Sequence, residues 1–173
     1  MNIVNTLVDN IYSDNIYFNE EIENTVIEDS TFIKILYSTK DIIMNGLYIH
    51  IPLKISSTEL HYKKIKYNFD VHANYNIIEK IIQLENNILT KYCSIKSLHK
   101  VKKKKSNVLP TIFNNGHIKI FPFDDYTSNN IKSKKTIHDL NISNGDFILK
   151  ISGIWEKDSS FGITYKFMNV YNK

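Results

Sequence analysis

The chain has 173 residues, of which 42% are hydrophobic, and this length suffices for one buried core but is short for two full domains. Its formal net charge is +4, and all 22 basic residues are lysine, because the sequence contains no arginine. Together with 29 isoleucines and 21 asparagines, this usage is typical of an AT-rich genome, so a patch of lysines and aromatics is weaker evidence for a binding site here than in an ordinary composition.

The cysteine content and the start of the chain predict an intracellular, reducing compartment. Cys93 is the single cysteine, so no internal disulfide can form and a reducing environment is expected. The first ten residues lack the features of a signal peptide, and no apolar run approaches the roughly 20 residues that cross a bilayer. We therefore expect a soluble intracellular protein without a membrane partner, in the host cytoplasm or nucleus at a replication site if it is viral.

The N-terminal part is acidic, whereas the rest of the chain is basic. Residues 1–33 carry seven acids and no lysine, and the remainder carries 22 lysines and 11 acids, which gives −7 against +11. Apolar residues between the acids predict that this acidic N-terminal segment, residues 1–30, is mostly structured. The asymmetry favours a basic binding surface with an acidic segment that competes for it or recruits a replication protein; the alternative is a hydrophilic edge of the fold.

Three strands and one long helix are predicted next along the chain. β-Branched and aromatic residues between turn formers predict strands over 31–37 and 45–51, the second stopped by Pro52. Alternation over 62–69 predicts a half-exposed strand. Apolar residues then recur at helical spacing over 74–92, after Asn74 as a plausible cap.

A lysine-rich segment, residues 96–107, follows this helix and contains Lys102, Lys103, Lys104 and Lys105 in succession. With Lys91, it places seven lysines and no acid within fifteen residues. One interpretation is a solvated loop that keeps the protein soluble. The other is a surface that contacts phosphates, because bound lysines release condensed counterions from a polyanion, or a nuclear import signal.

The last third is predicted to form two hairpins. Segments 108–113 and 117–121 flank Asn114-Asn115-Gly116, a turn sequence that tolerates positive φ, and residues 124–135 are expected to form a mobile loop before 137–142. In the closing hairpin, residues 145–171, two alternating runs flank a five-residue polar break. Strict alternation gives Trp155 the same parity as Leu149 and Ile151, and gives Lys150 the other. The total of about seven or eight short strands and one dominant helix predicts a mainly β (α+β) protein with a small barrel and an inserted helix, in a single domain over 1–173.

Motifs of common enzyme classes are missing from the sequence. It contains no nucleotide-binding glycine loop, no Gly-x-Ser-x-Gly and no His-Glu-x-x-His, and its six histidines are scattered singly. Asp124 and Asp125 are adjacent, but two aspartates at the start of a loop are more typical of a turn than of a catalytic pair. We therefore expect no enzymatic activity, no cofactor and no metal site.

The closing hairpin carries a pattern that resembles a known family. The residues Gly-Asp-x-x-x-Lys-Ile-x-Gly-Ile-Trp-x-x-x-x-x-Phe-Gly-Ile-Thr-Tyr-Lys, from Gly145 to Lys166, are similar to the C-terminal part of OB-fold single-stranded DNA-binding proteins of large DNA viruses and phages. The resemblance covers about an eighth of the chain, and no acidic C-terminal tail accompanies it. It implies an OB-like, five-stranded barrel that binds single strands without sequence preference and without catalysis, in viral DNA replication or recombination.

The predicted interface combines lysines that contact phosphates with aromatics that stack on bases. The candidate residues are Lys64, Lys66, Lys102, Lys103, Lys104, Lys105, Lys150, Trp155, Tyr165 and Lys166. Trp155 has a second interpretation as a core residue, and RNA is the alternative ligand.

Two other functions stay open from the sequence. One is a viral structural or host-interaction protein that binds other proteins through its β surface. The other is an enzyme acting on nucleic acid, which would require Asp146, Glu156 or Asp158 to converge on a metal.

Overall fold

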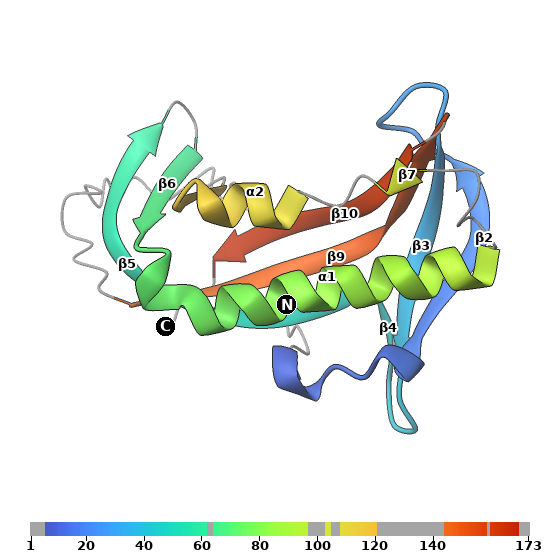
Figure 1. The fold of residues 1–173 in the computed structure, drawn as a ribbon, viewed down its shortest axis with the longest axis horizontal. Helices are drawn as coiled ribbons and strands as arrows, with labels where there is room; N and C mark the ends of the chain where they lie inside the picture. Colours follow the sequence, from blue (N-terminus) through green and yellow to red (C-terminus); the bar gives the residue numbers. More distant parts are fainter. Residues whose placement is uncertain are drawn as a thin grey trace, which may run out of the picture.

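The computed structural model describes residues 6–61, 64–96, 103–104, 108–120, 144–158 and 160–169, which fold into a strongly twisted sheet with two α-helices (Figure 1). The strands are β1 Thr6–Leu7, β2 Ile16–Glu23, β3 Thr31–Ser38, β4 Ile43–Asn45, β5 Leu47–His61, β6 Lys64–Phe69, β7 Lys103–Lys104, β8 His117–Ile120, β9 Asn144–Lys157 and β10 Ser160–Asn169. The helices are α1 Tyr75–Lys96 and α2 Val108–Asn114, with 3-10 turns η1 Val8–Asn10, η2 Ser13–Asn15 and η3 His72–Asn74.

Strand β9 organises the sheet, whose order is β2-β3-β9-β5-β6-β8. One edge of β9 pairs with β5 over 144–151 and then with β3 over 153–156, while the other edge pairs with β10 over 147–157. All ladders are antiparallel except β1 with β5 and β7 with β10. The expected α+β class is confirmed as a mostly antiparallel sheet with one long helix, but the sheet is not closed within the described residues, so the structure does not show a barrel.

Strand β5 is longer than its sequence predicted. The expected stop at Pro52 is wrong, because β5 continues for nine residues beyond Pro52 to His61. Pro52 pairs with Asp146 of β9, and the other described ladders of β5, with β1 at Ile49 and His50 and with β6 from Ile55 onward, do not include it. The register shift between Ile55 and Ser57 marks where β5 leaves β9 and begins to pair with β6.

Helix α1 confirms the predicted helix and extends it by one turn, to Lys96. Asn74 is 5% exposed, and its side chain does not play the simple capping role expected of it. Its Oδ1 accepts a hydrogen bond from the Lys54 backbone N–H at 2.8 Å, and its Nδ2 donates to the carbonyls of Lys54 and Asp70. The amide thus ties the start of α1 to β5, which fixes where the helix lies along the sheet.

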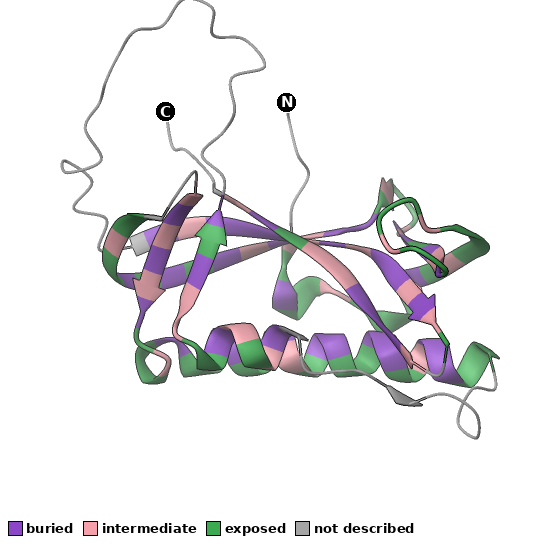
Figure 2. Cartoon of the chain, turned by 90° about the horizontal axis from the view of Figure 1, so that it is seen from above, coloured by how far each residue is buried: buried purple, intermediate pink, exposed green. Residues whose placement is uncertain are grey.

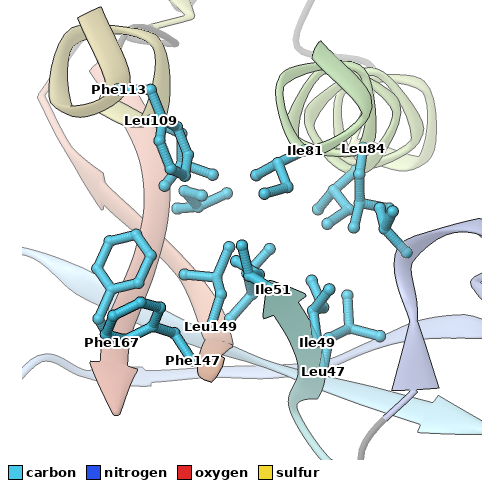
Figure 3. Packing of buried hydrophobic residues seen from close by; sticks show 14 of the residues in the cluster. Leu47, Ile49, Ile51, Ile81, Leu84, Leu109, Phe113, Phe147, Leu149 and Phe167 are labelled. Carbon is cyan, nitrogen blue, oxygen red and sulfur yellow. The ribbon is translucent and has the colours of Figure 1, made fainter. Parts of the chain in front are cut away.

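Both α-helices pack on the same side of the sheet, which we call the concave face (Figure 3). Figure 2 shows α1 running along this side below the strands. Figure 3 shows Ile81 and Leu84 of α1, and Leu109 and Phe113 of α2, pointing toward side chains of β5, β9 and β10. The sheet residues labelled there are Leu47, Ile49, Ile51, Phe147, Leu149 and Phe167, all buried in one hydrophobic cluster.

The predicted strand over 108–113 is wrong, since these residues form α2. Leu109 and Phe113 are both fully buried. Residues four apart lie on the same face of a helix and also on the same face of a strand, so this spacing could not distinguish the two structures. Pro110 lies in the first turn of the helix, where proline is tolerated. Gly116 then reverses the chain with φ of +66°, and its N–H donates to the Phe113 carbonyl at 2.9 Å, so the glycine turn was correctly located but ends a helix.

The other strand predictions agree with the structure where residues are described. Strands β3 and β8 match the expected segments, and β6 shows the predicted alternation, with Ile65, Tyr67 and Phe69 buried. The described part of the acidic N-terminal segment is structured, as predicted. Residues 124–135 and 137–142, and most of 96–107, lie outside the described residues.

Candidate nucleic-acid interface

The side of the sheet opposite α1 and α2 forms what we call the outer face. Because successive strand residues point to opposite sides, each buried concave residue has neighbours that point outward. Ladder pairing places these outward residues in rows that run across the strands. The rows comprise Ile22, Phe32, Trp155 and Gly162; Lys34, Gly153 and Thr164; Tyr48, Lys150 and Lys166; His50, Ile148 and Met168; and Pro52 with Asp146.

The first row is apolar and partly exposed. Phe32 lies directly opposite Trp155, and Trp155 lies opposite Gly162. The Phe32 ring covers Gly153, since a Cβ built on that glycine would lie 2.5 Å from the ring atom Cζ. Both aromatic side chains are half-buried, whereas Ile22, at the edge strand β2, is 47% exposed. Because Gly153 and Gly162 have no side chains, the neighbouring rings of Phe32 and Trp155 can lie along the sheet, where a base can stack on them.

The third row brings two lysines together. Lys150 and Lys166 are directly opposite each other on β9 and β10, and like charges in that position destabilise an antiparallel pair. The Nζ atom of Lys150 lies 5.0 Å from the centroid of the Tyr48 ring, a cation–π contact that holds the amine over β5. Lys34, exposed on β3, adds a third amine between this row and the aromatic row.

Negative charge on these rows is limited to one residue, Asp146. Its Oδ1 lies 2.9 Å from Nε2 of His50, so the carboxylate is held at the far end of β9 by a cross-strand partner. Lys150 and Lys166 therefore have no acid in their own row, whereas Lys34 lies opposite the bulge of β2 that contains Glu20. An anion placed between Lys150 and Lys166 would relieve their mutual repulsion.

A β-bulge puts Trp155 on this face. Tyr165 pairs with Ile151 and Thr164 with Gly153, so Ser152 has no opposite residue in β10. The extra residue reverses the alternation, and Ile154 and Glu156 become buried on the concave side. The predicted parity of Trp155, shared with Leu149 and Ile151, is therefore wrong: Trp155 lies on the same face as Lys150.

Tyr165 lies apart from the other predicted hairpin residues. Its ring packs against Phe167 at a centroid distance of 5.7 Å, as part of the cluster on the concave face. Burial, and secondarily the nearby Glu85 carboxylate, raises the pKa of the Tyr165 hydroxyl. The structure thus brings Lys150, Trp155 and Lys166 together and separates Tyr165 from them.

The remaining candidate lysines lie elsewhere on the fold. Lys64 and Lys66 are on β6, and Lys66 Nζ is 2.6 Å from Glu59 Oε1, so a carboxylate already partners this amine. Lys103 and Lys104 form β7, which pairs with Ser160 and Phe161 at the start of β10. Lys102 and Lys105 lie outside the described residues.

The three acids that a metal-dependent nuclease would need do not converge. Asp146 lies at the start of β9 on the outer face. Glu156 is buried on the concave face and accepts a hydrogen bond from the Tyr92 hydroxyl, and Asp158 lies in the turn with φ of +48°. Among the described residues, no group of three or more His, Cys, Asp or Glu side chains could hold a metal ion.

Sequence reasoning missed three residues of the face: Phe32, Lys34 and Tyr48. Phe32 and Lys34 alternate with Ile33 and Ile35, which are fully buried, and that alternation was the available signal for an outward side. It could not show that β3 and β5 lie beside β9, because those ladders join residues at least 90 positions apart.

Comparison with models of protein families, with curated proteins and with solved structures finds no match to this chain. Among the described residues, no helix is long and apolar enough to cross a bilayer.

Proposed function

We propose that this protein binds single-stranded DNA on the outer face of its sheet, without sequence preference and without catalysis, in viral DNA replication or recombination. The observation that carries the proposal is the placement of Lys34, Lys150 and Lys166 beside Phe32 and Trp155 on one face. Described helices cover only the opposite side. Bases would stack on the two rings, each contributing about 1–3 kcal/mol, while the amines contact phosphates.

The strand arrangement supports a finer proposal about the fold. Strands β10, β9, β5, β6 and β8 are joined in that order by ladders, and β8 lies near β10 without pairing to it. Five strands in this order fit a partly open barrel of the OB type, in agreement with the resemblance of the closing hairpin.

The proposal can be tested by titration of the protein with oligo-dT at two salt concentrations, followed by the emission of Trp155, the single tryptophan. Stacking predicts strong quenching at low salt that weakens at high salt. Phe32→Ala should weaken binding, whereas Tyr75→Ala, which removes a ring 55% exposed on α1, should not. Absence of binding at low salt would overturn the proposal, and equal binding of an RNA oligomer would broaden the ligand to both nucleic acids.

A protein partner is the second candidate, favoured by the partly exposed apolar row of Ile22, Phe32 and Trp155. Aromatic residues are enriched at the centres of protein interfaces. In that case the lysines reflect composition alone, and the same titration would show no oligonucleotide binding that depends on salt.

A further inference from the structure

A cavity lies at one end of the outer face, where the start of α1 approaches strands β5 and β9. Its volume is about 590 Å³. Small-molecule sites in proteins occupy about 300–1,000 Å³, so one nucleotide fits within it. Pro52 and Asp146, which form the last row of the outer face, are among the residues that line it. The cavity is therefore continuous with the face proposed to bind single strands.

Two side chains of opposite charge stand close together at this cavity. Pro52 pairs with Asp146 in the β5–β9 ladder, and Lys54 lies two residues further along β5. Leu53 and Ile55, on either side of Lys54, are buried, so Lys54 points to the outer face, as Asp146 does. The two residues are therefore diagonal neighbours, a relation that separates them by about 7–8 Å. Both line the cavity, so one ligand can reach a cation and a carboxylate together.

The carboxylate of Asp146 is held in position by a neighbouring strand. Nε2 of His50 lies 2.9 Å from Oδ1 of Asp146. The two oxygens of a carboxylate offer about four acceptor sites in total, so the contact with His50 leaves the group able to accept from a ligand as well. A fixed carboxylate is suited to a ligand with two neighbouring N–H donors, because both oxygens can accept at once.

An aromatic ring forms part of the opposite wall. Tyr75, the first residue of α1, lines the cavity and is 55% exposed, which leaves ring surface for a flat group to stack on. The Asn74 side chain accepts from the backbone N–H of Lys54 at 2.8 Å and donates to its carbonyl at 3.1 Å. These bonds hold the start of α1 against β5, so the ring is fixed relative to Lys54 and Asp146.

These three groups differ in how well they suit the four bases. Guanine presents two adjacent donors, N1–H and the N2 amino group, to a carboxylate, and its O6 and N7 atoms accept from a lysine amine. Thymine presents one donor between two carbonyl oxygens, which a carboxylate repels. Adenine and cytosine each present one amino donor beside a ring nitrogen that accepts. Guanine is therefore the base that matches a carboxylate and an amine set side by side.

We propose that the cavity binds a guanine base, with Asp146 accepting from N1–H and the N2 amino group, Lys54 donating to O6 or N7, and Tyr75 stacking on the ring. As a contact with a bound strand, this inference rests on the proposed function and adds a preference for guanine at one position. Thymine does not enter the cavity, so the binding of oligo-dT does not depend on Tyr75. A free guanine nucleotide presents the same chemistry and is the second source of the base.

Equilibrium dialysis with dGMP and dTMP tests the cavity without an oligonucleotide. The wild type should bind dGMP about tenfold more tightly than dTMP, the discrimination expected of a good bidentate base contact. Deoxyinosine monophosphate, which lacks only the N2 amino group, should lose most of this preference. Asp146→Asn should abolish the preference, whereas Asp41→Asn, the same change at an exposed site between β3 and β4, should keep it. A preference that is unchanged in Asp146→Asn would overturn the inference.

A second titration places the same base in a strand. Oligo-dT is compared with the same oligomer carrying one guanine at its 5′ or its 3′ end. Guanine at one of the two ends should raise the affinity about tenfold. The gain should vanish in Asp146→Asn and in Tyr75→Ala and persist in Asp41→Asn, with circular dichroism showing that every variant is folded.

The two titrations separate the cavity from the outer face. A preference for guanine that is confined to dGMP identifies the free nucleotide as the ligand and supports the cavity. Binding of dGMP without binding of any oligomer also supports the cavity, but overturns the function proposed for the outer face. Absence of a preference for guanine in both titrations would overturn the inference, and salt-dependent binding of oligo-dT would then leave the proposed function in place.

Discussion

The two faces of the sheet are built from the same strands but differ in almost every property. On β9, Leu149 is fully buried on the concave face, while its neighbour Lys150 stands on the outer face over the ring of Tyr48. The concave face is sealed by α1 and α2, whereas the outer face mixes amines with half-buried rings. Stability and binding should therefore be separable by substitutions only one residue apart.

The largest expected loss of stability comes from a substitution in the core on the concave face. Ile81 of α1 is fully buried, and its replacement by alanine should lower the free energy of unfolding by about 2–5 kcal/mol through lost burial and the cavity left behind. Denaturant unfolding measures the change. Ile43→Ala removes the same side chain where it is 75% exposed and should change stability by less than about 0.5 kcal/mol. Equal losses in both variants would contradict the assignment of the core.

A substitution at Gly153 should affect both faces. An alanine Cβ there would lie 2.3 Å from the carbonyl oxygen of Ile33 and 2.5 Å from Cζ of Phe32, so β3 must shift and the Phe32 ring must move. We expect Gly153→Ala to lower the free energy of unfolding by about 1–3 kcal/mol and to weaken oligonucleotide binding. Ser152→Ala, at the bulge, serves as the neighbouring control. Unchanged stability and binding in Gly153→Ala would contradict the observed packing of Phe32.

A further loss of stability is expected from a buried polar contact between α1 and β9 on the concave face. The Tyr92 hydroxyl donates to the buried Glu156 carboxylate, and desolvation followed by this carboxylate raises the pKa of Tyr92 well above its ordinary value of about 10. Tyr92→Phe should lower the free energy of unfolding near neutral pH by about 1–3 kcal/mol. Denaturant unfolding at pH 8 measures it, with the exposed Tyr75→Phe as control.

The same tyrosine should give stability an alkaline dependence. Below about pH 10 the hydroxyl is protonated in both states, so its contribution is constant. As pH rises above 10, the unfolded chain loses the proton while the folded chain keeps it, and stability falls. Tyr92→Phe should reduce this fall between pH 8 and 10.5. An identical decline in the variant and the wild type would show that Tyr92 titrates normally.

Local pattern was enough to predict strand β3 and helix α1, because each has an uninterrupted period in the sequence, and the hairpin β9–β10, because two alternating runs flank a polar break. It failed at Val108–Asn114, where two apolar residues four apart satisfy both a helix and a strand. It also failed at Trp155. A single bulged residue, Ser152, reverses the alternation there, and nothing in the local sequence indicates that this serine is bulged. Lys150, Trp155 and Lys166 were identified as site residues, but Phe32 and Tyr48 join them only through long-range ladders.

The salt dependence of oligo-dT affinity tests most directly whether the outer face binds nucleic acid. Each phosphate contact on a single strand contributes roughly 0.7 to the slope of log affinity against log salt. Lys150→Gln with Lys166→Gln should therefore lower that slope by about 1.4. The control, Lys40→Gln with Lys80→Gln, removes two exposed amines away from the outer face, in the β3–β4 turn and on α1, and should leave the slope unchanged. Equal slopes for the wild type and both double variants would contradict binding at this face.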